Sequence, residues 1–204
     1  MELISILIGY LIGSFPTGFV LLKILFGKDI RKEGSGNVGG RNTYETTGKL
    51  YLGIIVGITD AIKGLIPVLL FKNYYNLELA GYAFVGAVLG HCYSVWIKFK
   101  GGRGLGTAAG GFLILMWPII IFWLVGYAIV GKFTRSVHVS IVGAVVTTAL
   151  LVYILNQNLL LEKNNYLITS SVEEMKFYFS LIGLVVISTC IEPIKDFIKT
   201  GHAI

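Results

Sequence analysis

Long apolar runs alternate with short polar stretches along this chain of 204 residues. Each run has roughly 18 to 25 residues, the length that an α-helix needs to cross the hydrocarbon of a bilayer. The runs that predict membrane-spanning helices are residues 3–26, 50–71, 79–97, 141–156 and 175–191. The pattern therefore predicts a protein that crosses a membrane several times.

A sixth apolar stretch, residues 105–131, is interrupted by Trp117 and Pro118. Proline lacks a backbone N–H donor and breaks helices. Basic residues gather in loops 27–49, 98–104 and 132–138, where Arg135 lies, and in the C-terminal tail, whereas loops 72–78 and 157–174 are nearly balanced. By the positive-inside rule the basic segments are cytoplasmic. They share one side only if residues 105–131 enter and leave at the same face, as two short helices.

These patterns predict an all-α integral membrane protein, a single domain over residues 1–204. It has seven helical segments, five full spans and two short helices, with glycine-rich cytoplasmic loops. The N-terminus is expected outside and the C-terminus inside, in the inner (plasma) membrane. We expect a monomer.

Composition excludes an ordinary soluble domain, because 55% of the residues are hydrophobic and only 14% are charged. The net charge of +6 lies in loops beside spans, which favours anionic lipid or anionic substrates over nucleic acid. Cys92 and Cys190 have no metal-type spacing, and three aspartates are too few for a magnesium cluster. We therefore expect no metal, and the absence of Walker and dinucleotide motifs indicates no nucleotide cofactor.

The first basic loop contains the glycine-rich run 34–42. Its small residues allow backbone N–H groups to converge, and its polar side chains are Ser35, Asn37, Arg41 and Asn42. With Gly36, these are expected to hold phosphate oxygens as an anion nest does. The alternative is a tightly turned connection between two helices.

The second loop repeats this composition just before an apolar helix. The residues expected to bind an anion there are Lys100, Gly101, Gly102, Arg103, Gly104 and Thr107. Amides at the start of the following helix add positive potential toward a phosphate. The alternative is a basic anchor beside the membrane.

Polar side chains also occur within the apolar runs. Asp60 and Lys63 are three residues apart and can pair on one helical face, either to support the loops or as a purely structural ion pair. His91 is a candidate proton acceptor, substrate partner or loop-orienting group. Ser140 follows the third basic loop and either reaches the same face or caps a helix. His138 and His202 are expected to be solvated.

The order and spacing of several motifs between Gly9 and Thr107 resemble the bacterial acyl-phosphate glycerol-3-phosphate acyltransferases, the PlsY family. The matching segments are 10–18, 29–31, 34–39, Asp60 with 63–64, 90–91 and 99–102. The resemblance covers about half of the chain. From Gly110 onward only hydropathy and a short basic loop before Ser140 resemble the family.

The resemblance implies an enzyme that moves a fatty acyl group from acyl phosphate to the 1-hydroxyl of glycerol 3-phosphate, giving lysophosphatidic acid in phospholipid biosynthesis. It implies no coenzyme A, carrier protein or metal. By position, Ser35, Asn37 and residues 100–104 surround phosphate and His91 lies close by, so Ser35, His91 and Arg103 are the expected catalytic residues. An acyl phosphate is already activated, so positioning and charge stabilisation suffice.

The chain departs from the family pattern at several positions. Glu45 stands where the family has an arginine, and Arg41 either replaces that cation or pairs with Glu45. Arg103 replaces a lysine, Ser94 a proline and Pro193 an asparagine. These changes leave open a paralogue that acylates another acceptor, a catalytically inactive relative, or a transporter or lipid-binding protein of the same fold.

Overall fold

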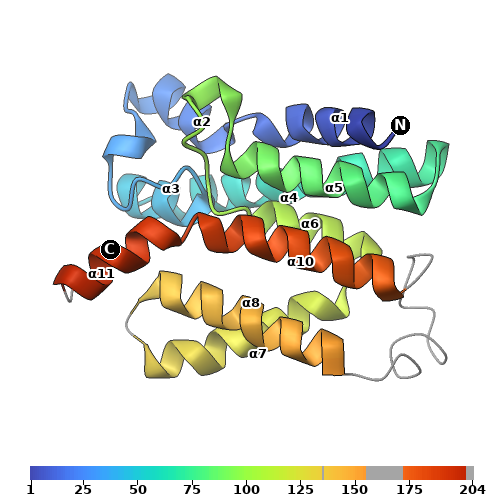
Figure 1. Cartoon of the computed structure of the whole chain (residues 1–204). Helices are drawn as coiled ribbons and strands as arrows, with labels where there is room; N and C mark the ends of the chain where they lie inside the picture. The colour runs from blue at the N-terminus through green and yellow to red at the C-terminus, as the bar shows by residue number, and fades with distance from the viewer. Residues whose placement is uncertain (135, 155–171, 201–204) are drawn as a thin grey trace. The chain divides into compact units, whose positions relative to one another are not determined.

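The structure is a computed structural model that describes residues 1–134, 136–154 and 172–200 (Figure 1). Every regular element in this part of the chain is helical, which confirms the all-α fold class. Arg135, most of loop 157–174 and His202 lie outside the described residues. The chain divides into two compact units, Met1–Gly111 and Phe112–Ile204.

The first unit contains long helices and, between them, several short helical segments. Its elements are α1 (Glu2–Ser14), α2 (Thr17–Phe26), η1 (Ile30–Lys32), α3 (Gly40–Thr47), α4 (Leu50–Tyr74), α5 (Leu77–Cys92), η2 (Val95–Ile97) and the start of α6 (Leu105–Leu115). The second unit contains α7 (Pro118–Phe133), α8 (Val137–Ile154), α10 (Val172–Ser188) and α11 (Ile191–Thr200).

Four stretches of helix in the described residues are long and apolar enough to cross a membrane: Glu2–Phe26, Leu50–Tyr74, Leu77–Ile97 and Val137–Ile154. A fifth is possible if the bent pair α10 and α11 counts as one span. The helices α6 and α7 are shorter, and the chain breaks between them at Met116 and Trp117, as Pro118 predicts. The first predicted span differs from a single helix, because Pro16 divides it into α1 and α2.

Small residues allow α1 and α5 to pack backbone against backbone, and Figure 1 shows the two helices side by side. A Cβ atom added to Gly13 would overlap the backbone of Ala87, and one added to Gly90 would overlap Tyr10. Close approach of this kind is a common source of helix association in membranes, where lipid removes the hydrophobic driving force. It places the end of α1 directly beside His91.

The start of α6 packs on α4 in the same way. A Cβ atom on Gly64 would overlap the Thr107 backbone, and one on Gly110 would overlap the Ala61 backbone. These glycines fix α6, and hence the end of the second glycine loop, against the helix that carries Asp60 and Lys63.

The second unit contains one residue that departs from expectation. His138 is buried in the first turn of α8 instead of being solvated. The prediction assumed that the basic loop continues through residue 138, whereas α8 already begins at Val137 and turns this side chain inward.

Candidate active site

The break in the first span organises the polar interior of the first unit. Because Pro16 has no N–H group, helical hydrogen bonding cannot run continuously from α1 into α2. The Ser94 hydroxyl donates to the Ser14 carbonyl, and Lys63 Nζ donates to the Phe15 carbonyl at 2.6 Å. Backbone groups freed within a membrane protein need such internal partners. Lys63 from α4 and Ser94 from the turn between α5 and η2 therefore hold the break in place.

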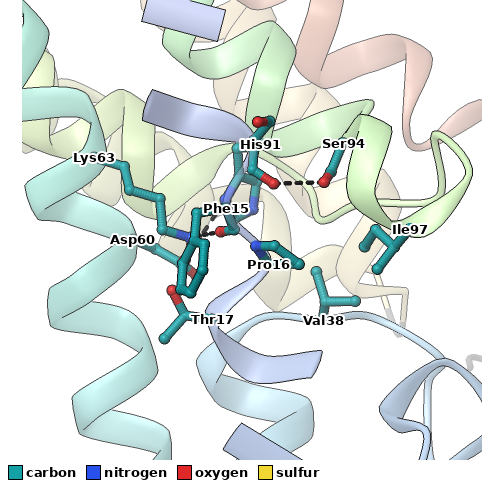
Figure 2. A pocket seen from close by; sticks show the side chains of 10 residues that line it. Phe15, Pro16, Thr17, Val38, Asp60, Lys63, His91, Ser94 and Ile97 are labelled. Carbon is teal, nitrogen blue, oxygen red and sulfur yellow. Dashed lines mark hydrogen bonds and ion pairs between the residues drawn. The ribbon is translucent and has the colours of Figure 1, made fainter. Parts of the chain in front are cut away.

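The predicted ion pair between Asp60 and Lys63 is present next to this break. Lys63 Nζ lies 2.6 Å from Asp60 Oδ1, and the two side chains are 9% and 6% exposed. His91 Nδ1 is 3.6 Å from the same carboxylate oxygen. A buried charge is tolerated when it is paired and hydrogen-bonded. Figure 2 shows these side chains converging from α4 and α5 on the Phe15–Pro16 break.

A small hollow surrounds this cluster, with space too narrow for a water-sized molecule. Its lining residues are Ser14, Phe15, Pro16, Thr17, Val38, Asp60, Lys63, His91, Ser94 and Ile97. The side chains around the Asp60 and Lys63 pair are therefore tightly packed.

The second glycine loop rests on His91. The N–H groups of Gly101 and Gly102 donate to the carbonyls of Cys92 and His91 at 3.1 and 3.0 Å. A Cβ atom on Gly101 would overlap the His91 carbonyl, and one on Gly102 would overlap His91 Nε2. The paired glycines are thus required by the close approach of the loop to this histidine. The imidazole lies between the Asp60 carboxylate and the loop.

The turn before this loop has an unusual backbone. Lys98 and Phe99 both have positive φ, 57° and 59°, although neither is glycine. This left-handed conformation is costly for residues with a Cβ atom. Hydrogen bonds from the Phe99 and Lys100 amides to Ser94 and Ile97 hold it. Lys100 is exposed and Arg103 is half-buried.

The first glycine loop is shaped by Asn42, whose side chain is 2% exposed. Its Nδ2 atom lies 3.2, 3.0 and 2.8 Å from the carbonyl oxygens of Ile30, Glu33 and Asn37, which share its two N–H donors. Its Oδ1 atom accepts from the Ser35 amide at 3.0 Å. The amide is fully engaged within the protein, so its position supports a role in shaping the loop.

Ser35 and Asn37 of the first loop are both half-buried. Ser35 is half-buried between Gly34 and Gly36, which have φ of 50° and 70° and so favour glycine. The Asn37 Oδ1 atom accepts from the Gly39 amide at 2.8 Å. The loop therefore presents Ser35 on a defined and tightly turned backbone.

Direct contacts join the segments that precede the two glycine loops, η1 and η2. Arg31 Nη1 donates to the Ile97 carbonyl at 3.0 Å, and Ile97 packs in one buried cluster with Ile30, Val38 and Leu22. Arg31 also hydrogen-bonds to Asp29 and holds the pKa of that carboxyl down at about 2. These contacts bring the segment that precedes the first glycine-rich run next to the segment that precedes the second loop.

Three other predicted residues occupy different surroundings. Arg41 Nε pairs with Glu45 Oε1 at 2.7 Å on the exposed side of α3, which is the alternative pairing that the sequence allowed. Thr107 is fully buried in α6 against α4, where its position supports packing. Ser140 lies in the second unit, and its hydroxyl donates to the Ser136 carbonyl at 3.0 Å.

Sequence reasoning missed two hydrogen bonds that join the first span to residues 93–96. The Trp96 indole N–H donates to Ser14 Oγ at 2.9 Å, and the Tyr10 hydroxyl donates to the Tyr93 carbonyl at 2.6 Å. Proline following Ser14 within an apolar run was the available signal, since it implies freed carbonyls that need partners. The sequence did not indicate which distant donors would supply them.

A family model for glycerol-3-phosphate acyltransferase matches residues 3–200. The chain belongs to the glycerol-3-phosphate acyltransferase family. Two similar curated proteins carry the family name. "Glycerol-3-phosphate acyltransferase 2" of Moorella thermoacetica is 41% identical over 75% of this chain and 79% of its own. The glycerol-3-phosphate acyltransferase of Syntrophotalea carbinolica is 41% identical over 76% of this chain and 80% of its own length.

Solved structures agree with this assignment. A crystal structure of PlsY, an integral membrane glycerol 3-phosphate acyltransferase in its glycerol 3-phosphate form, matches with a TM-score of 0.78 and 28% identity. The match covers 100% of this chain and 95% of that one. The lysophosphatidic acid form of PlsY gives a TM-score of 0.77. This glycerol-3-phosphate acyltransferase family member is therefore an integral membrane acyltransferase, as the motifs predict.

Proposed function

We propose that this protein transfers a fatty acyl group from acyl phosphate to the 1-hydroxyl of glycerol 3-phosphate. The oxygen of that hydroxyl forms a new bond to the acyl carbonyl carbon, and the bond from this carbon to the phosphate oxygen breaks. Lysophosphatidic acid and inorganic phosphate result. The names of the relatives and the glycerol 3-phosphate and lysophosphatidic acid forms of PlsY support this acceptor and product.

The observation that carries the proposal is the contact of Arg31 and Val38, before and within the first glycine-rich run, with Ile97, directly before the second loop. Both substrates are anionic phosphates, and the loops supply the Ser35 hydroxyl and the cations Lys100 and Arg103. Donors that are fixed before the reaction stabilise developing charge without reorganisation. An acyl phosphate brings its own activation, so the proposed step needs neither a cofactor nor a metal.

The surroundings of His91 support a positioning role more than a direct contact with the acceptor. Its side chain is buried between Asp60 and Gly102, and its carbonyl holds the second loop. We assign the proton of the attacking hydroxyl to a phosphate oxygen of a bound substrate. His91 then acts by keeping the Gly101–Gly102 backbone, and with it Lys100 and Arg103, in place.

We further place the reaction at the cytoplasmic face of the inner membrane. The basic loops around the proposed site support this side by the positive-inside rule. Acyl phosphate carries a fatty chain and glycerol 3-phosphate is water-soluble, so a site at the membrane surface reaches both.

The direct test uses purified protein in lipid vesicles, supplied with acyl phosphate and a panel of phosphorylated and free polyols. Phosphate release and lipid product should both require glycerol 3-phosphate. Acylation of a different polyol would identify a paralogue, and no consumption of acyl phosphate with any acceptor would contradict the proposed reaction.

Variants locate the site in the same assay. Ser35→Ala, Lys100→Ala and Arg103→Ala should each lower turnover by about 100-fold to 1,000-fold, the usual cost of removing one charge-stabilising donor. Lys72→Ala is the matched control. Lys72 lies in the last turn of α4, away from the two glycine loops, and its variant should retain wild-type turnover. Unchanged turnover in all three loop variants would exclude this assignment.

A further inference from the structure

The last described helix, α11, carries an apolar face that the described residues of the second unit cover only in part: Ile194 and Phe197 are half-buried, and Ile191 and Ile198 are exposed. None of its ten residues is buried. Ile191 and Ile198 are 45% and 75% exposed, unusually high values for isoleucine. In a soluble protein such a surface would favour aggregation or a protein partner.

The side chains of α11 divide cleanly between two faces. At about 100° per residue, Ile191, Ile194, Phe197 and Ile198 share one arc of the helix. The opposite arc holds Glu192, Lys195, Asp196 and Lys199. On this wheel the two lysines lie closer to the apolar arc than the two carboxylates do. Long lysine side chains in such positions extend their ammonium groups from an apolar boundary toward polar headgroups.

The apolar face of α11 continues the exposed face of α10. Phe177 and Leu184 are exposed on α10, and Ile191 and Ile198 follow at the same interval of seven residues. The two helices bend by 43° across their break. Figure 1 shows α11 continuing from α10 beyond this bend. The outward surface of an apolar helix in an integral membrane protein faces lipid, and exposed apolar side chains are present on both sides of the break.

We propose that α11 lies in the interfacial layer of the bilayer, with Ile191, Ile194 and Ile198 among the upper acyl-chain carbons and its charged arc in the headgroups. The bend turns the chain away from the direction of α10, as a helix leaving the hydrocarbon for the interface requires. This location does not depend on the acyl transfer reaction. The partner is the lipid surface itself.

The charges of α11 indicate whether apolar burial or electrostatic attraction holds the helix at the lipid surface. Two lysines face one glutamate and one aspartate, and Lys195 Nζ already pairs with Glu192 Oε1 at 2.7 Å. The helix therefore has no net side-chain charge with which to attract anionic lipid. Its association follows from burial of apolar area and is expected to be insensitive to the content of anionic lipid.

Site-directed spin labelling tests this placement in vesicles that contain the full chain. Single labels are introduced by Ile198→Cys and Asp196→Cys, which lie on opposite arcs. The natural cysteines, Cys92 and Cys190, are buried, so wild-type protein treated in parallel gives the background. Collisions with apolar oxygen should be several-fold more frequent for the label at 198, and collisions with a water-soluble nickel complex several-fold more frequent for the label at 196.

Two results would overturn the proposal. Equal and high nickel accessibility at both positions would place α11 in water, and high oxygen accessibility at both would place it within the hydrocarbon. A label from Leu184→Cys on α10 provides the lipid-facing reference. The measurement is repeated in zwitterionic vesicles and in vesicles with added phosphatidylglycerol. Immersion at residue 198 that requires the anionic lipid would contradict the apolar origin of the contact.

Discussion

Arg41 and Glu45 neutralise each other on the exposed side of α3, four residues apart. This pair competes with any use of Arg41 as a ligand for the acceptor phosphate, because the same guanidinium cannot satisfy two anions equally. The pair is solvent-exposed, so it contributes little to stability and can open at low cost. Its effect is therefore expected on substrate affinity.

We predict that Glu45→Gln lowers the KM for glycerol 3-phosphate and that Arg41→Ala raises it about tenfold, with little change in kcat. A charge-assisted hydrogen bond to a phosphate has about this effect. Steady-state kinetics at fixed acyl phosphate provide the measurement. If both variants keep the wild-type KM, Arg41 does not contact the acceptor.

Asp29 gives a pH dependence of stability. Its hydrogen bonds with Arg31 hold its pKa down from 3.8 to about 2, so the folded state favours the ionised carboxylate. The resulting contribution is present at pH values above 3.8 and is lost as the pH falls through about 2. Asp29→Asn lacks this titration.

We therefore predict that the stability difference between wild type and Asp29→Asn shrinks between pH 4 and about pH 2. Thermal unfolding in detergent at a series of pH values measures it. A difference that stays constant over this range would mean that the Asp29 and Arg31 contact makes no pH-dependent contribution.

At the scale of elements, glycine decides how closely α4 and α6 approach. Two glycines of α4 form a matched pair for testing this. A Cβ atom on Gly64 would overlap the Thr107 backbone, whereas one on Gly57 has open space around it. Gly64→Ala should destabilise the protein by about 1–3 kcal/mol, because the helices must separate. Gly57→Ala should be neutral or stabilise by about 0.5–1 kcal/mol. Equal melting temperatures for the two variants would contradict the close contact.

The Asp60 and Lys63 pair joins α4 to the broken first span and to His91. Lys63→Met leaves a buried carboxylate unpaired and the Phe15 carbonyl without its ammonium donor, at an expected cost of about 3–5 kcal/mol. The double variant Asp60→Leu with Lys63→Met removes the unpaired charge and should lose less stability than the sum of the single variants. Additive losses in thermal unfolding would argue against coupling between the two side chains.

At the scale of the whole molecule, the proposed site requires both glycine loops on one side of the membrane. We predict that cysteines introduced by Ser35→Cys and Arg103→Cys react with a membrane-impermeant maleimide from the cytoplasmic side. A cysteine from Tyr74→Cys, at the far end of α4, should react from the other side. Labelling of residues 35 and 103 from opposite sides would remove the basis of the proposed enzyme site.

Local sequence features predicted those parts of the molecule that depend on near neighbours. Apolar run length predicted four stretches that are long and apolar enough to cross a membrane. Pro118 predicted the break between α6 and α7, and a spacing of three predicted the Asp60 and Lys63 pair. Contacts across long separations were not predictable in this way. Lys63 meets a carbonyl 48 residues away. The amide of Asn42 was expected to bind substrate, yet it binds three carbonyls whose positions only the folded loop determines.

The support of the Phe15 carbonyl by Lys63 also constrains biogenesis. The chain is synthesised from its N-terminus, so the ribosome delivers the first span to the insertion machinery before residue 63 has been made. Until α4 enters the bilayer, the kink at Pro16 lacks its ammonium partner. The broken first span, α1 and α2, can therefore reach its final structure only after α4 has been inserted. Nascent chains that are arrested before residue 63 should be preferred targets for membrane proteases.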